Sequence, residues 1–486
     1  IEHSGSDAST TSAIRSLHRF ITSRQSFKDL LLAQRQPRKD ESIQLSCSYN
    51  PSYDKIILKA KQALDYFLLV GPPGTGKTSM ALQYMVRESI SSDQSILLMS
   101  YTNRAVDEIC GMLTDNDIDY IRIGNEFTCD TKYKQHLLSQ IIEHCPKLNV
   151  IRQRILDCKV IVGTTSTIQG KSYLFNLKNF STVIVDEASQ ILEPNIIGLL
   201  AQADSKFVLI GDYKQLPAVV QQDSAVSSVN DVSLNNVCLD NCRNSLFERL
   251  IHIENTNNRN EFTGVLRRQG RMHPDIAEFP NKMFYYKENL QPVPLEHQTK
   301  KQLEYSLESI DYLDDALKAH RMVFIPSIFC KEPNISDKVN SEEAKIVTDI
   351  LRRIYRFYGV KFNADKTVGV IVPYRNQISM IRKEIEKLGI PQLEEISIDT
   401  VERYQGSQRD VIIYSFTIQN RYQLDFLTSN CFEEDNHIID RKLNVAITRA
   451  RKQMILTGNT DILNNDIIFK SLIEHVKSKG GYIEYE

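Results

Sequence analysis

Residues 66–78 read Tyr66-Phe-Leu-Leu-Val70 and then Gly71-Pro-Pro-Gly-Thr-Gly76-Lys77-Thr78, and this stretch decides the fold. The apolar run predicts a buried strand, and the residues that follow the glycines, 79–87, predict a helix. The spacing G-x-x-x-x-G-K-T between a strand and a helix is the signature of a phosphate-binding loop. Its glycines let backbone N–H groups converge on an anion, and the helix N-terminus adds its positive end. The sequence therefore predicts an α/β domain that binds a nucleotide.

The residues of this loop are the first candidate site. We expect Lys77 to reach the β- and γ-phosphates of the nucleotide and Thr78 to ligate Mg²⁺. The candidate nucleotide-binding residues of the loop are Gly71, Pro72, Pro73, Gly74, Thr75, Gly76, Lys77, Thr78 and Ser79.

The bulk composition is that of an ordinary globular protein. The chain has 486 residues, 41% of them hydrophobic and 25% charged, so two or more domains can each bury a core. A net charge of −2 means that any nucleic-acid binding must come from a local groove. No apolar run approaches the length of a membrane span, and no secretory signal opens the chain. Because the chain begins at Ile1 without a methionine, we expect it to be a piece of a longer protein.

The nine cysteines are scattered singly, and no C-x-x-C pair occurs among them. This pattern favours reduced thiols in a cytoplasmic protein, or a nuclear one if the source is eukaryotic. It does not support an iron–sulfur cluster in this part of the chain.

Short apolar runs recur along the chain and are separated by helical patterns. They predict buried parallel strands at Ile96–Met99, Lys159–Val162, Thr182–Val185, Phe207–Ile210, Met322–Ile325, Val368–Val372, Glu395–Ile398, Val411–Phe416 and Met454–Thr457. A polar stretch near residues 255–261 divides them into two α/β sets, and only the first set has a phosphate loop. We therefore predict a helical N-terminal stalk at residues 1–45, a first domain at 46–255 and a second at 256–486, with the nucleotide cleft between the two domains.

Two further strand ends carry polar residues that suit phosphate chemistry. The strand 183–185 ends in Asp186 and Glu187, where one carboxylate can hold Mg²⁺ and the other can deprotonate the attacking water. Another strand ends in Gly211-Asp-Tyr-Lys-Gln-Leu-Pro217, and the amide of Gln215 can hydrogen-bond a γ-phosphate or the water. The bland alternatives are solvated acids at a strand end and an ordinary Gly-Asp turn.

The order of these motifs resembles that of the superfamily 1 helicases. The first half also contains Tyr101-Thr-Asn-Arg-Ala-Val-Asp107 and Asp186-Glu-Ala-Ser-Gln190, and the second half continues the series over residues 269–274, 372–377, 400–406 and 443–450. The resemblance covers roughly residues 45–460. It is to the 5′→3′ branch, which contains the nonsense-mediated-decay RNA helicase and the eukaryotic replication nuclease–helicase. The resemblance implies two tandem RecA-like domains that use ATP and Mg²⁺.

The resemblance also implies roles for particular residues. Arg449 and Arg271 would reach the γ-phosphate from the second domain and act in catalysis beside Lys77, Glu187 and Gln215. Gly406 would belong to the ATP site, and hydrolysis would open and close the cleft. The residues that would meet nucleic-acid phosphates are Thr102, Asn103, Thr164, Thr165, Pro373, Tyr374, Arg375 and Thr400. For each threonine, a local role at a strand end is an equal alternative.

The sequence departs from the family at two positions whose residues would contact the adenine base. The aromatic residue that stacks on adenine is replaced by Gly270, and the glutamine that reads the adenine edge aligns with Tyr53. We hypothesise that Tyr53 takes over the stacking and belongs to the ATP site, which would relax selectivity for ATP over GTP.

Three functions remain open from the sequence. The first is an ATP-dependent 5′→3′ helicase or translocase on single-stranded DNA, in DNA replication or repair, acting as a monomer and carrying a further N-terminal domain. The second is the same motor on RNA. The third is a nucleotide-gated clamp on nucleic acid with weak ATPase activity.

Overall fold

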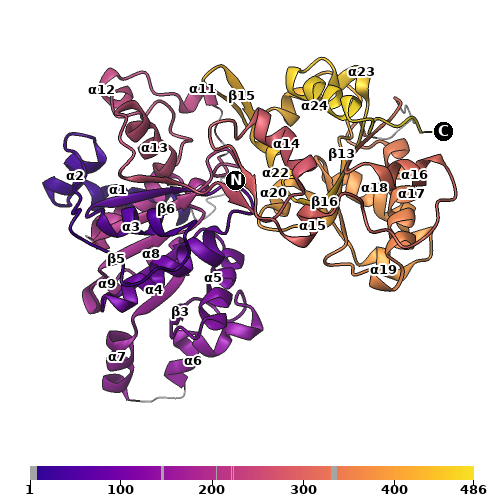
Figure 1. Ribbon diagram of the computed structural model, residues 1–486. Helices are drawn as coiled ribbons and strands as arrows, with labels where there is room; N and C mark the ends of the chain where they lie inside the picture. The colour runs from indigo at the N-terminus through magenta and orange to yellow at the C-terminus, as the bar shows by residue number, and fades with distance from the viewer. Residues whose placement is uncertain are drawn as a thin grey trace, which may run out of the picture. The chain divides into compact units, whose positions relative to one another are not determined.

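The computed structural model describes residues 8–143, 147–203, 205–220, 222, 224–329 and 336–485 (Figure 1). The chain forms two compact units. The first comprises Ile1–Pro72, Gly76–Tyr213 and Pro217–Leu266, and the second comprises Pro73–Thr75, Lys214–Leu216 and Arg267–Glu486. Each unit contains one parallel sheet flanked by helices, so the α/β class and the tandem RecA-like arrangement predicted from sequence are confirmed.

The sheet of the first unit is parallel throughout, in the order β3-β4-β2-β5-β6-β1-β7. Its strands are β1 (Tyr66–Val70), β2 (Ile96–Ser100), β3 (Ile121–Ile123), β4 (Val160–Thr164), β5 (Thr182–Val185), β6 (Lys206–Gly211) and β7 (Thr263–Val265). All five residues of β1 are buried, because strands on both sides and helices on both faces cover it.

The helices of the first unit connect these strands. They are α1 (Ala8–Ile21), α2 (Gln25–Leu31), α3 (Asp54–Gln62), α4 (Gln83–Ser91), α5 (Asn103–Asp115), α6 (Leu138–Glu143), α7 (Leu148–Asp157), α8 (Thr165–Gly170), α9 (Leu174–Leu177), α10 (Glu193–Ala203), α11 (Ser224–Ser227), α12 (Val232–Asn235) and α13 (Leu246–Thr256). Three further helical segments are the π-helix η1 (Lys77–Leu82) and the 3₁₀-helices η2 (Thr131–His136) and η3 (Ala188–Gln190). The predicted N-terminal helices form, but α1 lies on α10, where Ser16 Oγ accepts from Gly198 N over 2.9 Å.

The second unit has a five-stranded parallel sheet in the order β10-β16-β13-β11-β12. Its strands are β10 (Met322–Pro326), β11 (Val368–Val372), β12 (Ser397–Thr400), β13 (Arg409–Ser415) and β16 (Ala450–Gly458). Two small pairs lie outside it, β8 (Arg268–Gln269) with β9 (Gln291–Pro292) and β14 (Cys431–Glu434) with β15 (His437–Asp440). A separate apolar core packs on each face of the five-stranded sheet.

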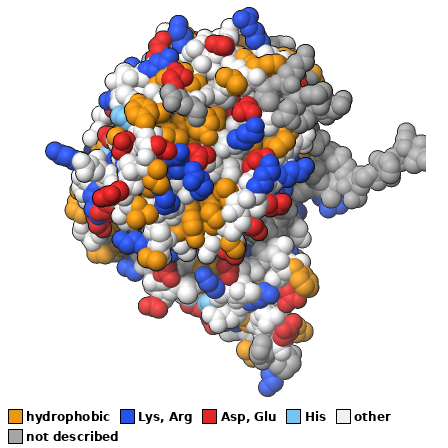
Figure 2. All heavy atoms as spheres, turned by 90° about the vertical axis from the view of Figure 1, so that its right-hand side faces the viewer, with side chains coloured by type: hydrophobic (Ala, Val, Ile, Leu, Met, Phe, Trp, Pro, Cys, Tyr) orange, Lys and Arg blue, Asp and Glu red, His pale blue; other side chains and the backbone are white. Residues whose placement is uncertain are grey.

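The helices of the second unit are α14 (Pro274–Met283), α15 (Glu296–Thr299), α16 (Tyr312–Ala319), α17 (Ser341–Tyr358), α18 (Arg375–Glu386), α19 (Pro391–Glu394), α20 (Val401–Tyr404), α21 (Gln423–Leu427), α22 (Arg441–Ile447), α23 (Thr460–Leu463) and α24 (Ile467–Ser478), with the turn η4 (Gly359–Lys361). Among the described residues, no helix is both long and apolar enough to cross a membrane. Figure 2, which looks onto the side where Figure 1 draws α16 to α19, shows acidic and basic side chains mixed with apolar ones.

The boundary between the units differs from the one expected from sequence. The sequence placed residues 256–266 in the second domain, whereas the first unit extends to Leu266. The physical reason is β7, a three-residue strand that pairs with β1 at the edge of the first sheet. Its Thr-Gly-Val sequence carries little strand signal, so its position depends on the neighbouring strand.

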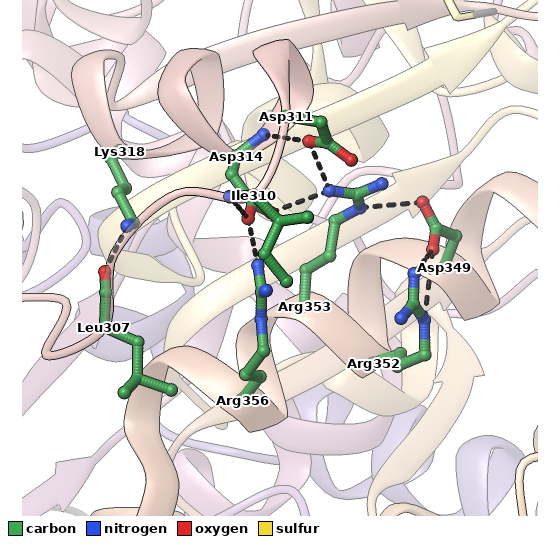
Figure 3. A network of polar contacts seen from close by, with 9 residues as sticks. All are labelled: Leu307, Ile310, Asp311, Asp314, Lys318, Asp349, Arg352, Arg353 and Arg356. Atoms are coloured by element: carbon green, nitrogen blue, oxygen red, sulfur yellow. Dashed lines mark hydrogen bonds and ion pairs between the residues drawn. The ribbon is translucent and has the colours of Figure 1, made fainter.

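An ion-pair network fixes α16 against α17 in the second unit (Figure 3). The buried carboxylate of Asp314 accepts from Arg353 Nη1 over 2.7 Å and also from Arg356. Asp311 caps α16 by accepting from Asp314 N and pairs with Arg353 over 2.7 Å. The bond from Arg353 is the main cause that lowers the pKa of Asp311 to about 2.

Candidate nucleotide site and nucleic-acid-facing edges

The phosphate loop leaves the first sheet at the end of β1, as the sequence predicts. Gly74 and Gly76 have φ of +72° and +74°, a left-handed conformation that glycine adopts at little cost. Lys77 Nζ donates to Gly71 O over 2.6 Å, so the lysine folds back over the start of the loop. A Cβ at Gly71 would stand 2.1 Å from Lys77 Cγ, and this close approach requires glycine. The loop is therefore shaped around the lysine that is expected to meet the phosphates.

Thr78 and Asp186 meet in the first unit although 108 positions separate them in sequence. Thr78 Oγ1 donates to Asp186 Oδ2 over 2.6 Å, because η1 begins beside β1 and Asp186 follows β5. Asp186 is only 2% exposed, and its burial, together with the neighbouring Glu187, raises its pKa to about 6. A divalent cation would offset this desolvated negative charge.

The oxygen donors at this point fit Mg²⁺. A hydroxyl and a carboxylate are ligands that this ion prefers, and it commonly takes the others from phosphate and water. Among the described residues, no cluster of three or more His, Cys, Asp or Glu side chains could hold a metal by itself. A Mg²⁺ ion at this point would therefore take part of its coordination from the nucleotide and from water.

Glu187 follows Asp186 in a conformation that is uncommon for a residue with a side chain. Its φ is +55°, in the left-handed region, and its Oε2 accepts from Gln190 Nε2 over 2.8 Å. Strain of this kind is found at positions where a side chain must be aimed. The two carboxylates thus have different hydrogen-bond partners, Gln190 for Glu187 and Thr78 for Asp186, which suits separate roles for the two acids.

In the second unit the structure brings Gln215 and Arg449 together. Arg449 is 2% exposed, and its Nη2 donates to Gln215 Oε1 over 2.6 Å. Its Nε donates to Val445 O over 3.1 Å, on the helix α22 that precedes it. Ser407 O, next to the candidate Gly406 with its φ of +82°, accepts from Nη1 over 3.4 Å. The guanidinium is thus held in place from three sides.

Arg271 lies close to the same segment. Its Nη1 donates to Thr448 O over 3.3 Å and its Nε to Gln408 Oε1 over 2.9 Å. Its own carbonyl accepts from the ring of His297 on α15 over 2.8 Å. Both candidate arginines therefore belong to one hydrogen-bonded group around the end of α22.

The place of the missing aromatic residue is filled from elsewhere in the chain. A Cβ at Gly270 would stand 3.1 Å from Leu295 Cδ1, and the Gly270 N–H donates to Gly74 O over 2.8 Å. Tyr53 lies in the first unit, where its ring meets that of Tyr84 edge-on at 5.7 Å. A Cβ at Gly76 would stand 2.8 Å from the Tyr53 hydroxyl. Tyr53 thus lies beside the phosphate loop, and its stacking on a base stays a prediction.

The candidate nucleic-acid residues of the first unit lie at one edge of its sheet. Ser100 and Thr164 are register partners at the ends of β2 and β4, which brings Thr102 and Asn103 to the same edge as Thr164 and Thr165. Thr102 caps α5, because its hydroxyl accepts from Ala105 N over 3.1 Å. Thr164 caps α8 by accepting from Thr167 N over 3.1 Å, and its own proton goes to Thr167 Oγ1 over 2.7 Å. Thr102 and Thr164 therefore both satisfy local backbone at a strand end, which is the alternative role that the sequence left open.

The candidates of the second unit also share one edge. Val372 and Thr400 are register partners at the ends of β11 and β12, and Pro373, Tyr374 and Arg375 follow β11 directly. The ring of Tyr374 is 8% exposed and stacks on Phe426 at 5.0 Å, so most of this side chain is used in packing. Arg375 is exposed and Thr400 is half-buried.

Sequence reasoning gave no role to Lys214, which precedes Gln215. Its side chain is 0% exposed and its Nζ lies 3.0 Å from Glu288 Oε2 and 2.9 Å from Glu434 Oε2. Asn444 Nδ2 donates to its carbonyl over 2.7 Å. The sequence does show a lysine inside a motif loop, which could have marked it as a candidate. Its two carboxylate partners, however, follow 74 and 220 positions later and could not be paired with it from the sequence.

Comparisons with known proteins agree with this geometry. Two family models, each described as an AAA domain, match residues 48–150 and 146–223 and residues 242–461. The chain is 30% identical over 440 residues to the DNA replication ATP-dependent helicase/nuclease JHS1 of Arabidopsis thaliana, covering 90% of this chain and 30% of that protein. It is 27% identical to a regulator of nonsense transcripts 1 homolog of Neurospora crassa, over 86% of this chain and 38% of that protein. An uncharacterized ATP-dependent helicase of Methanocaldococcus jannaschii is 26% identical, over 95% of this chain and 76% of that protein. The chain thus spans about a third of the length of the first two relatives.

A phosphate loop at the end of a central parallel strand, with a threonine and an aspartate in contact beside it, defines a P-loop nucleoside-triphosphatase. With a second parallel unit that carries the two arginines, and with these relatives, the chain belongs to the superfamily 1 helicases, in the group of the DNA replication helicase/nucleases and the regulators of nonsense transcripts.

Proposed function

We propose that this chain is an ATP- and Mg²⁺-dependent motor that moves 5′→3′ along single-stranded DNA. The observation that carries the proposal is the 2.6 Å contact between Thr78 and Asp186 beside the phosphate loop. This contact supports the proposal because the two side chains that would ligate Mg²⁺ meet next to Lys77, the residue expected to meet the phosphates.

The proposed mechanism assigns one task to each side chain. Lys77 exchanges its bond with Gly71 O for the β- and γ-phosphates, and Thr78 and Asp186 hold the metal. Bound with the nucleotide, Mg²⁺ neutralises charge that develops on the transferred phosphoryl group. Glu187 orients and deprotonates the attacking water.

Gln215 and the two arginines would respond to the γ-phosphate. Arg449 and Arg271 neutralise its developing charge, a contribution of about 10³–10⁵ in rate in related nucleotide hydrolases. After hydrolysis the γ-phosphate departs, and Arg449 then forms its hydrogen bond with Gln215 again. We propose that this exchange, with Gly406 and Tyr53 also at the ATP site, couples hydrolysis to movement of the two units and hence to translocation.

Nucleic acid would lie along the edges where β2, β4, β11 and β12 end. The polar residues there, Thr102, Asn103, Thr164, Thr165, Pro373, Tyr374, Arg375 and Thr400, would hold backbone phosphates without reading bases. DNA is preferred because the helicase/nuclease relatives are named for DNA replication. RNA is the second candidate, because another relative is named as a regulator of nonsense transcripts. We further propose a monomeric motor in the cytoplasm or nucleus, with a further domain before this part of the chain.

Steady-state ATP hydrolysis tests the proposal. The rate is measured alone, with a DNA oligonucleotide and with an RNA oligonucleotide of the same sequence, and Lys77→Ala serves as the inactive control. We expect strong stimulation by DNA and little by RNA, because the 2′-hydroxyl distinguishes the two strands. Greater stimulation by RNA would favour the second candidate. No hydrolysis in any condition, by folded protein that still binds the strand, would refute the motor and leave the clamp.

A further inference from the structure

A hollow in the second unit is lined by none of the residues assigned to the nucleotide or nucleic-acid sites above. Its volume is about 430 Å³, within the range of small-molecule sites. Lys366 and Thr367 before β11, Asp410 in β13, and Arg451 and Lys452 in β16 all line it. These positions are at or near the amino ends of parallel strands, so the hollow opens at the amino edge of the sheet. We call it the amino-edge pocket.

The charges of this pocket are strongly unequal. Six Lys and Arg side chains and three carboxylates line it, an excess of three positive charges with the histidine neutral. Two of the cations, Arg451 and Lys452, share Asp410 at 2.9 and 2.7 Å, and Lys300 pairs with Glu296 and Glu304. The excess therefore resides in the remaining cations.

Those remaining cations are Arg321, Lys361 and Lys366. Within the described part of the chain, Lys361 and Lys366 have no ion-pair partner, and both are exposed. An anion bound in the pocket would offset the charge that these two lysines bring to it.

Arg321 gives the pocket a rigid wall. Its side chain is 4% exposed, Nη1 donates to Lys452 O over 3.1 Å, and Nη2 donates to Lys300 O and Gln302 O over 2.5 and 3.1 Å. Its Nε has no hydrogen-bond partner among the described residues, and Asp275 Oδ2 is 3.9 Å away. Three backbone carbonyls therefore fix this guanidinium in the wall of the pocket.

The position separates this pocket from the proposed nucleic-acid contacts. Pro373 follows the carboxyl end of β11 and Thr400 is the last residue of β12, whereas Lys366 precedes the amino end of β11. The five residues of β11 lie between them, a span of about 15 Å at the usual rise per residue. A strand held at the carboxyl edge therefore does not occupy the amino-edge pocket.

We propose that the amino-edge pocket binds a small polyphosphorylated molecule. The excess of three positive charges among the lining residues favours a ligand with several negative charges, and planar guanidinium groups favour phosphate oxygens. The limited volume selects a compact ligand over a polymer. The site is independent of the proposed motor, because none of its lining residues belongs to the nucleotide or nucleic-acid sets.

Inorganic tripolyphosphate is the probe, titrated by calorimetry in about 0.15 M salt, where surface charges are screened beyond about 8 Å. The background is Lys77→Ala, which weakens binding at the phosphate loop. The test variant adds Lys361→Ala and Lys366→Ala, two exposed residues whose truncation leaves the core intact. The matched control adds Lys383→Ala and Lys470→Ala instead, on exposed positions of α18 and α24.

We expect one tripolyphosphate per chain on the background protein, about tenfold weaker binding in the test variant and no change in the control. The affinity should also be the same when a single-stranded oligonucleotide is present at saturation. Absence of binding, or equal weakening by both variant pairs, would overturn the proposal. Displacement of the probe by the oligonucleotide would instead assign the pocket to the nucleic-acid path and would equally overturn it.

Discussion

Replacement of Arg449 by alanine removes a buried charged side chain of the candidate site. The guanidinium is 2% exposed and donates to Gln215 at 2.6 Å, to Val445 O at 3.1 Å and to Ser407 O at 3.4 Å. Hydrogen bonds of charged groups contribute about 1.5–3 kcal/mol each, and the longest of the three adds little. We therefore expect the free energy of unfolding to fall by about 3–5 kcal/mol.

The effect on catalysis should be of a different kind. If Arg449 neutralises the transferred phosphoryl group, kcat falls by about 10³–10⁵, or roughly 4–7 kcal/mol of barrier. The KM for ATP should stay within a few-fold, because the arginine acts mainly in the transition state. Urea unfolding and DNA-stimulated ATP hydrolysis measure the two effects separately.

A double-mutant cycle with Gln215→Ala isolates the contact itself. Because the two side chains touch, the coupling free energy in unfolding should be about 1.5–3 kcal/mol. Arg441→Ala is the control, since Arg441 begins the same helix and packs over the ring of Phe432 at 4.3 Å. It should cost stability and leave kcat nearly unchanged. A folded Arg449→Ala protein with kcat within tenfold of the parent would refute the catalytic assignment, and a coupling of zero would refute the contact.

Three further changes probe other parts of the site. Glu187→Gln should lower kcat about 10²–10⁴-fold with KM for ATP unchanged, and a fully active variant in the hydrolysis assay would remove Glu187 from the base role. Tyr53→Ala should raise KM for ATP about fivefold to tenfold while Tyr53→Phe does not, and equal KM values would show that the ring does not stack on the base. Burial raises the pKa of Asp440 to about 7, so the folded state binds its proton more tightly and stability falls by up to about 4 kcal/mol as the pH rises from about 4 to 7. Asp440→Asn keeps the cap of α22, and it should raise the free energy of unfolding more at pH 8 than at pH 5 in urea titrations. The exposed Asp461→Asn is the control and should show no such difference. Equal gains for Asp440→Asn at the two pH values would contradict this prediction.

The motifs predicted so much of the fold because each combines a strand end with a local chemical requirement. The contact of Thr78 with Asp186 could be expected in this way, since both follow the carboxyl ends of strands of one parallel sheet, β1 and β5, with only β6 between them. The edge strands β3 and β7 could not, because each has three residues and exists only through its neighbour.

The same limit applies to single side chains. Tyr374 looks from the sequence like a phosphate contact, yet Phe426 packs on its ring from 52 positions further along the chain. Leu295 fills the space beside Gly270 in the same way. Such pairings join residues whose spacing follows no period, so a sequence pattern cannot reveal them.

The hydrogen bonds that cap α5 and α8 determine which hydroxyl groups at the proposed nucleic-acid edge of the first unit can still donate a proton to a phosphate oxygen. The Thr102 hydroxyl accepts from Ala105 N, and this leaves its proton free for a phosphate oxygen. Thr164 has already given its proton to Thr167 Oγ1, so in that turn the proton that remains is the one on Thr167. A capped helix start still presents its first backbone N–H groups to an anion. If nucleic acid binds along this edge as we propose, these hydrogen bonds move the expected donor at its second position from Thr164 to the hydroxyl of Thr167 and the N-terminus of α8.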